Sequence, residues 1–531
     1  MNYPVEKINS HTNQILNQDW RGYLYLVRTK RLRKNLLSTK VEVAPPRISS
    51  VEDLFIQAGN TANSIWLNTA FDILSTDIDK VTTTKKDKSK LPLILKDKNK
   101  LRKALEKNKY FKLEALHDLF PDVWKEVLLF ASEKEQLKLE LAEKWVKDLP
   151  DEDIKMLGMA KQEFEFIFEL QRSIQPLVDS AFIKQIGVAG QSSPIEIQKI
   201  IENLRVYSKK MKESKFFQGH LKYQGFPKYL NQIAEAYASG ETDPVKLHEI
   251  WGKVDRAGVQ LAKSGCPIII NCHNNNPAYQ DELEFSVQIR ANEALELEKL
   301  AIPYYKKAKK LSPNKAIPPV IVGFNISNSG VNLYYQVLGV ARTNITSIHS
   351  EQLERGIDGK VVLSNFLTTL AHELGHQIRV DNISNSFDEI KADLLGIFID
   401  YLLKKEPRKN IQTVPIEQYI RELVYGYSEE MLTSSGDEGL SSDHYSLLGQ
   451  FFISFFAGKK IINIKGGMIN IDTNKQNSFP ELIQIGADIL EMCEDPIFDE
   501  TKAKEFFENR IRPIINYEAL KPYLKIFEGE I

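Results

Sequence analysis

The sequence predicts an α+β protein that is mostly α-helical, and three patterns carry this prediction. Apolar residues recur three and four positions apart through most of residues 111–262, with charged residues between them, which is typical of amphipathic helices. β-Branched runs bounded by Gly, Pro and Asn begin near residue 265 and predict short strands. Two alternating runs flank Lys465-Gly466-Gly467, where glycine can adopt the positive φ of a tight turn, and they predict a β-hairpin.

Changes in these patterns divide the chain into three segments. Residues 1–110 form a mixed, basic N-terminal region, whose Lys-rich runs we interpret as solvated loops that lead into a helix. Residues 111–262 form a helical domain, in which Ser193-Pro194 marks the start of one helix. Residues 263–531 form a second, largely helical domain that contains the small β elements, and we expect a cleft between the two halves.

Composition narrows the classes of function. A chain of 531 residues, 42% of them hydrophobic, can bury a sizeable core in each of several domains. Its 70 basic and 71 acidic residues leave a net charge of −1, so nothing favours nucleic acid as a partner. The longest apolar runs fall short of the ~18 residues that span a bilayer, and the N-terminus does not match a signal peptide. Three cysteines without a CxxC spacing exclude a disulfide framework, and we expect a cytoplasmic protein.

The C-terminal segment contains His372-Glu373-Leu374-Gly375-His376 within an apolar helical pattern. Residues four apart share one face of a helix, so both imidazoles can bind one Zn²⁺ at about 2.0–2.1 Å. Glu373 lies next to this face, where it can act as general base on a water molecule at the metal. Gly375 would let another backbone or a substrate approach closely. The alternative is a helix with two incidental histidines on a partly buried face.

A catalytic zinc site needs a third protein ligand, and an amphipathic helix that follows the polar turn DNISNS offers three carboxylates. Glu389 and Asp393 are four apart and share a face, so we predict that Glu389 binds the metal. Asp393 would then accept the ring N–H of a ligating histidine. Asp388 is the alternative ligand. Glu389 could instead complete a capping box with Ser386, and the helix dipole favours acidic residues in a first turn in any case.

These residues resemble the dipeptidyl peptidase III family of zinc peptidases, in its shorter form with a plain HExxH. The family's second helix carries an acidic pair in a pattern such as EE-C-R-A-E, and Asp388-Glu389-Ile390-Lys391-Ala392-Asp393 is similar, which implies that Glu389 binds the metal. His444 begins an apolar run followed by a Gly-containing hairpin, which implies that its side chain faces the reaction centre. Tyr279-Gln280-Asp281 is similar to a Tyr-Arg-Asp element, which implies that Tyr279 polarises the scissile carbonyl. The resemblance covers about residues 265–510.

The motif and the resemblance predict a zinc-dependent hydrolase that cleaves peptide bonds of short peptides, with one Zn²⁺ per chain. His372, His376 and Glu389 would hold the metal, and Glu373 would move the proton. Two alternatives are a zinc-stabilised protein that binds a peptide or partner without cutting it, and a zinc hydrolase of a non-peptide amide or ester. The intact Glu373 favours an enzyme over the first, whereas no residue separates the second from a peptidase. We expect a peptide as the partner, and neither nucleic acid nor a membrane.

Overall fold

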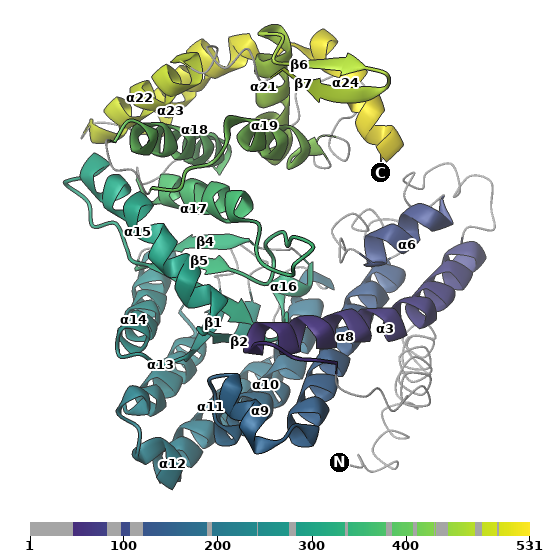
Figure 1. Ribbon diagram of the computed structural model, residues 1–531, viewed down its shortest axis with the longest axis vertical. Helices are drawn as coiled ribbons and strands as arrows, with labels where there is room; N and C mark the ends of the chain where they lie inside the picture. The colour runs from purple at the N-terminus through teal and green to yellow at the C-terminus, as the bar shows by residue number, and fades with distance from the viewer. Residues whose placement is uncertain are drawn as a thin grey trace. The chain divides into compact units, whose positions relative to one another are not determined.

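The protein is mostly helical with a few small sheets in the computed structural model, and this confirms the α+β prediction (Figure 1). The structure describes residues 46–81, 97–106, 121–187, 194–241, 243–274, 283–334, 338–342, 344–378, 385–406, 411–428, 431, 444–472, 480–495 and 499–530. The chain divides into two compact units. Unit 1 comprises Met1–Asn292 and Phe324–Gln336, and unit 2 comprises Glu293–Gly323 and Val337–Ile531.

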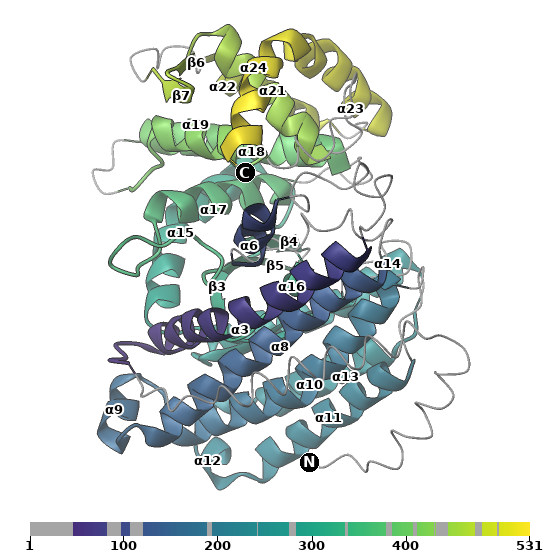
Figure 2. The ribbon, with the colours of Figure 1, turned by 90° about the vertical axis from the view of Figure 1, so that its right-hand side faces the viewer.

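Unit 1 is built on long amphipathic helices. Figure 2 shows α3, α8 and α10 running alongside one another, and their apolar faces enclose a core that includes the fully buried Trp66, Trp145 and Phe168. The predicted helix start at Pro194 is confirmed, because α11 begins there. The helices of this unit are α3 (Val51–Val81), α6 (Lys98–Glu106), α8 (Pro121–Asp148), α9 (Asp151–Met156), α10 (Lys161–Gly187), α11 (Pro194–Glu213), α12 (Lys215–Gln218), η2 (Leu221–Tyr223), α13 (Phe226–Ala238), α14 (Pro244–Lys263) and α16 (Val331–Tyr334).

The first two strands belong to unit 1. Strands β1 (Ile268–Asn274) and β2 (Leu283–Ile289) pair antiparallel, and every residue of β2 is buried. Helix α10 covers β2, and the Gln171 side chain accepts a hydrogen bond from the backbone N–H of Val287 at 2.7 Å. The units differ from the three predicted segments 1–110, 111–262 and 263–531, because α3 packs against α8 and because β2, which is buried along its whole length, is covered by α10 of the helical half.

Unit 2 combines a second helical core with the remaining strands, except for the last two residues of β3, Phe324 and Asn325, which belong to unit 1. Strand β3 (Val320–Asn325) pairs parallel with β5 (Ile345–His349), and β4 (Gly339–Arg342) pairs antiparallel with β5. The predicted hairpin is confirmed as β6 (Ile462–Lys465) and β7 (Met468–Ile471), with Gly466 and Gly467 at φ of 62° and 78°. The helices are α15 (Glu293–Leu311), α17 (Leu363–Gln377), α18 (Asn385–Lys404), α19 (Ile416–Tyr425), α21 (His444–Gly458), α22 (Pro480–Glu494), α23 (Glu500–Phe506), η4 (Phe507–Ile511), η5 (Arg512–Ile514) and α24 (Tyr517–Glu530).

Helix α18 lies at the centre of the second core. It packs against α17, α21 and α22, and its apolar residues are buried along most of its length. The aromatic run of α21 contributes Phe451, Phe452 and Phe456, each fully buried. Among the described helices, none combines the length and the apolar character that crossing a bilayer requires. Helices α17 and α18, which carry the predicted metal ligands, are thus held by a large apolar core.

Candidate metal centre

Helices α17 and α18 approach each other unusually closely, and a glycine on each helix permits it. A Cβ on Gly375 would lie 2.3 Å from the carbonyl oxygen of Ala392, and a Cβ on Gly396 would lie 3.0 Å from the carbonyl oxygen of Ala371. The two backbones therefore touch where a side chain would separate them. Of the two roles predicted for Gly375, the structure shows the approach of another backbone. This contact brings the first turns of α18 against the histidines of α17.

The three predicted ligands come together at this crossing. The Nε2 atoms of His372 and His376 are 3.1 Å apart, and Glu389 Oε2 lies 3.4 Å and 3.5 Å from them. Ligand bonds of about 2.0–2.1 Å to a tetrahedral ion place donor atoms about 3.3–3.4 Å apart. Two imidazoles and a carboxylate also form a donor set that suits Zn²⁺. Among the described residues, these three form a group of metal-binding type with its donor atoms within reach of one ion.

Each histidine is oriented by a carboxylate on α18. His372 Nδ1 lies 2.7 Å from Asp393 Oδ1, as the spacing predicted, and Tyr427 donates its hydroxyl to the other Asp393 oxygen at 2.7 Å. His376 Nδ1 lies 2.7 Å from Asp388 Oδ2. Because a carboxylate accepts a hydrogen bond from Nδ1–H, each ring turns its Nε2 towards the space between the ligands, where the neutral imidazole offers a lone pair. Asp388, the alternative ligand, thus contacts the outer side of a histidine instead.

The charges of the cluster reinforce one another. Burial alone would lower the pKa of His372, but Asp393 and Glu389 outweigh it and hold that pKa well above its ordinary value. Burial lowers and the carboxylates of Glu389 and Asp388 raise the pKa of His376, with a net rise to about 9. Burial would raise the pKa of Glu389, yet the imidazoles of His376 and His372 hold it well below its ordinary value. The carboxylates thus favour positive charge at this point of the structure. A bound cation would supply that charge.

Glu373 stands beside the three donor atoms and is not one of them. Its side chain is buried, and its carboxylate lies against β4, where a Cβ on Gly339 would be only 2.8 Å from Glu373 Oε1. Burial is the main cause that raises the pKa of Glu373, against the opposing effect of the two histidines. A carboxylate with a raised pKa is a stronger base, so its position and its basicity both suit proton transfer.

The structure does not place every predicted site residue. Tyr279 lies outside the described residues, and so does the side chain of His444, although α21 begins at that residue as expected. The side chain of Ser386 is also outside them, so the capping box is not observed, and Glu389 directs its carboxylate to the histidines. Three further residues contact the site and were not predicted from the sequence: Tyr427, Lys391 and Gly339. Only Lys391 had a local signal, because it follows Asp388 by three positions on one helix.

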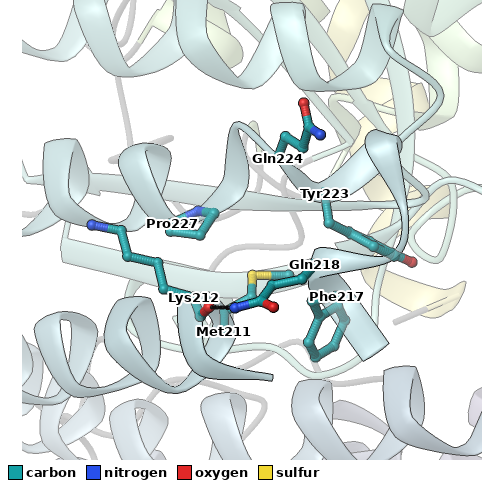
Figure 3. A pocket seen from close by; sticks show the side chains of 7 residues that line it. All are labelled: Met211, Lys212, Phe217, Gln218, Tyr223, Gln224 and Pro227. Atoms are coloured by element: carbon teal, nitrogen blue, oxygen red, sulfur yellow. Dashed lines mark hydrogen bonds between the residues drawn. The ribbon is translucent and has the colours of Figure 1, made fainter. Parts of the chain in front are cut away.

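A separate pocket lies in unit 1 and contains none of these residues (Figure 3). Its volume is about 250 Å³, and it opens between the end of α11 and the start of α13. Lys212 is the one cationic side chain of its lining, beside an apolar floor that includes Met211 and Phe217. The residues that line this pocket include no carboxylate, histidine or cysteine.

No family model, no curated protein and no solved structure matches the chain. The resemblance to the dipeptidyl peptidase III family therefore rests on the motif residues alone.

Proposed function

We propose that the protein is a zinc-dependent hydrolase of the dipeptidyl peptidase III-like kind, which cleaves peptide bonds in short peptides. The observation that carries the proposal is the triangle of His372, His376 and Glu389 donor atoms, with separations of 3.1, 3.4 and 3.5 Å, and the buried Glu373 beside it. A zinc ion that only stabilises a protein does not require a further carboxylate, such as that of Glu373, beside the three donor atoms. The position of Glu373 therefore favours a catalytic site over a structural zinc site.

Each residue has a defined task in this proposal. His372, His376 and Glu389 would hold one Zn²⁺ per chain, and the bound ion would supply Lewis acidity and lower the pKa of a water molecule from about 15.7 towards 7. Glu373 accepts the proton of the attacking water and passes it to the leaving amine. His444 and Tyr279 are proposed to donate to the developing oxyanion, on the basis of the family resemblance.

The proposed setting is the cytoplasm, with a peptide as partner and without nucleic acid or a membrane. None of the three cysteines forms a disulfide in the structure, and two of them, Cys266 and Cys272, are buried. Burial raises the pKa of Cys266 to about 12 and that of Cys493 to about 11, so these thiols stay protonated near neutral pH. Cysteines that form no disulfide support a reducing compartment.

The test measures the zinc content and the turnover of a pool of short peptides for the wild type, Glu373→Ala and Glu389→Ala. We expect about one zinc per chain in the wild type, zinc loss in Glu389→Ala, and retained zinc with at least ~10²-fold slower cleavage in Glu373→Ala. Wild type without zinc would overturn the proposal. Zinc without peptide cleavage would favour the binding protein or the hydrolase of another amide or ester, and screening such compounds would separate these two.

A further inference from the structure

The two carboxylates that orient the histidines are themselves held in different ways. Asp393 is 8% exposed, and the neutral hydroxyl of Tyr427 donates to its Oδ2. The Asp388 side chain is 36% exposed at the rim of the cluster, and its second oxygen, Oδ1, pairs with the ammonium of Lys391 at 2.5 Å. Exposure lets water compete for a carboxylate, so Asp388 needs a stronger partner than Asp393 does.

Lys391 is placed to be that partner. Its side chain is fully buried on α18, three residues after Asp388, so its ammonium approaches the carboxylate from inside the protein. A buried ammonium is costly unless it is paired, and pairing with Asp388 offsets this cost as long as the carboxylate faces the ammonium. In that arrangement Asp388 has Oδ1 on Lys391 and Oδ2 on His376 Nδ1.

The charge of Lys391 also has a place in the cluster as a whole. Four carboxylates converge here, from Glu373, Asp388, Glu389 and Asp393. Their mutual repulsion favours rotation of the most exposed member, Asp388, away from the others and into water. The ammonium of Lys391, 2.5 Å from Asp388 Oδ1, opposes that rotation from the buried side.

We propose that Lys391 is a positioning residue for the metal ligand His376, and that it acts through Asp388. The inference rests on the proposed zinc site and adds a residue to it. Lys391 holds Asp388 in place, Asp388 holds the Nδ1 proton of His376, and the Nε2 lone pair of His376 is thereby aimed at the metal before it binds.

The experiment measures the dissociation constant for Zn²⁺ alone, by competition with a chromophoric chelator, in the full chain. Lys391→Met is expected to weaken binding by about 10–100-fold, as is usual when the support of a metal ligand is removed, and Lys391→Arg should restore part of the loss. Lys404→Met is the matched control, because Lys404 lies on the same helix and pairs with Asp400 at 2.7 Å, away from the donor atoms. Its affinity for zinc should equal that of the wild type.

The route through Asp388 is tested by a double-mutant cycle. If Lys391 acts only through Asp388, the double variant Asp388→Asn/Lys391→Met should bind zinc no more weakly than Asp388→Asn alone. It also removes both charges, so it remains measurable if Lys391→Met leaves the carboxylate unpaired and does not fold. Combined with Tyr427→Phe, by contrast, the effect of Lys391→Met should multiply, because Tyr427 supports the other histidine.

Three outcomes would overturn the inference. Lys391→Met could fold and bind zinc as tightly as the wild type, the Asp388 and Lys391 effects could multiply, or Lys404→Met could weaken binding as much as Lys391→Met. Each of these presupposes a wild type that binds zinc. A wild type that binds none overturns the proposed function itself, so the two failures are distinguishable.

Discussion

The carboxylate of Glu373 packs against Gly339, a residue without a side chain. Gly339 on β4 lies so close that a Cβ there would be 2.8 Å from both Cγ and Oε1 of Glu373. The carboxylate of Glu373, the proposed general base, thus lies between α17 and β4, beside the donor atoms. Because proton transfer requires reach within about 2.6–3.2 Å, the fit of Gly339 against Glu373 bears directly on the rate of the proposed reaction.

We therefore expect Gly339→Ala to slow peptide cleavage by at least ~10-fold, because the new methyl group pushes the Glu373 carboxylate aside. The zinc content should not change, since the three heavy atoms nearest to a Cβ at Gly339 all belong to Glu373 and none belongs to a proposed ligand. Steady-state turnover with parallel zinc analysis measures both effects. Gly458→Ala serves as the control, because a Cβ at that position meets no heavy atom within 4 Å. Equal turnover of the two variants would contradict this role.

At the scale of elements, the crossing of α17 and α18 creates the site. The histidines come from one helix, and the proposed third ligand and both orienting carboxylates come from the other. Their meeting depends on the backbone contacts at Gly375 and Gly396, and the surrounding apolar residues hold the two helices at that separation. A wider crossing would carry Glu389 away from both imidazoles, while each helix by itself remained intact.

Gly375→Ala should consequently damage both stability and metal binding. The Cβ would lie 2.3 Å from a backbone oxygen of Ala392, which cannot rotate away, so the helices must separate. We expect the free energy of unfolding to fall by about 1–3 kcal/mol, as for other overpacked cores, and zinc affinity to fall with it. Urea unfolding and zinc titration measure the two effects.

The contrasting variant for that experiment is Gly59→Ala, also inside a helix. A Cβ there meets only Lys138 carbons at 3.6 Å, an ordinary contact, so alanine should stabilise by about 0.5–1 kcal/mol through helix propensity. Destabilisation of the same size in both variants would show that the close crossing has no special role.

Across the whole chain, unit 1 is made of two separate stretches of sequence, because Glu293–Gly323 between them belongs to unit 2. Phe324–Gln336 is held there by a buried carboxylate of α10, because Asp179 accepts hydrogen bonds from Ser329 Oγ at 3.0 Å and from the backbone N–H of Gly330 at 2.8 Å. Ser132 of α8 donates to its other oxygen. Burial nevertheless raises the pKa of Asp179 to about 7.

This pKa predicts a pH dependence of stability with a definite sign. In the unfolded chain Asp179 loses its proton near pH 3.8, whereas in the folded protein it keeps the proton up to about pH 7. Its contribution to the free energy of unfolding is therefore fully present below about pH 4 and is lost as the pH rises to about 7. Between pH 5 and pH 8 we expect a loss of roughly 2–3 kcal/mol from this group.

Asp179→Asn removes the titration and can keep the hydrogen bonds, because its amide oxygen accepts from Ser329 and Gly330 and its amide can donate to Ser132 Oγ. Its stability relative to the wild type should rise between pH 5 and pH 8. Denaturant unfolding at both pH values measures the difference. A difference that stays the same at both values would show that Asp179 is ionised in the folded protein throughout this range.

Local patterns by themselves determined the mostly helical fold class, the helix that begins at Pro194 and the hairpin at Gly466-Gly467. They also indicated that His372, His376 and Glu389 would meet, with Asp393 behind one histidine. Each of these features depends on residues within a few positions of one another, or on one amphipathic helix following another after a short turn. Helical spacing and the chemistry of zinc ligands are sufficient for such predictions.

Other features required the tertiary structure. Tyr427 and Gly339 each lie 34 positions from the residue that they contact. The strands β1 and β2 belong to unit 1, where α10 packs on β2 and α14 packs on β1. Asp388 contacts His376 Nδ1 and Lys391 instead of joining the three donor atoms, although its place in the sequence suits a ligand as well as that of Glu389. These outcomes depend on which distant backbones pack together, and packing between distant residues leaves no period in the sequence.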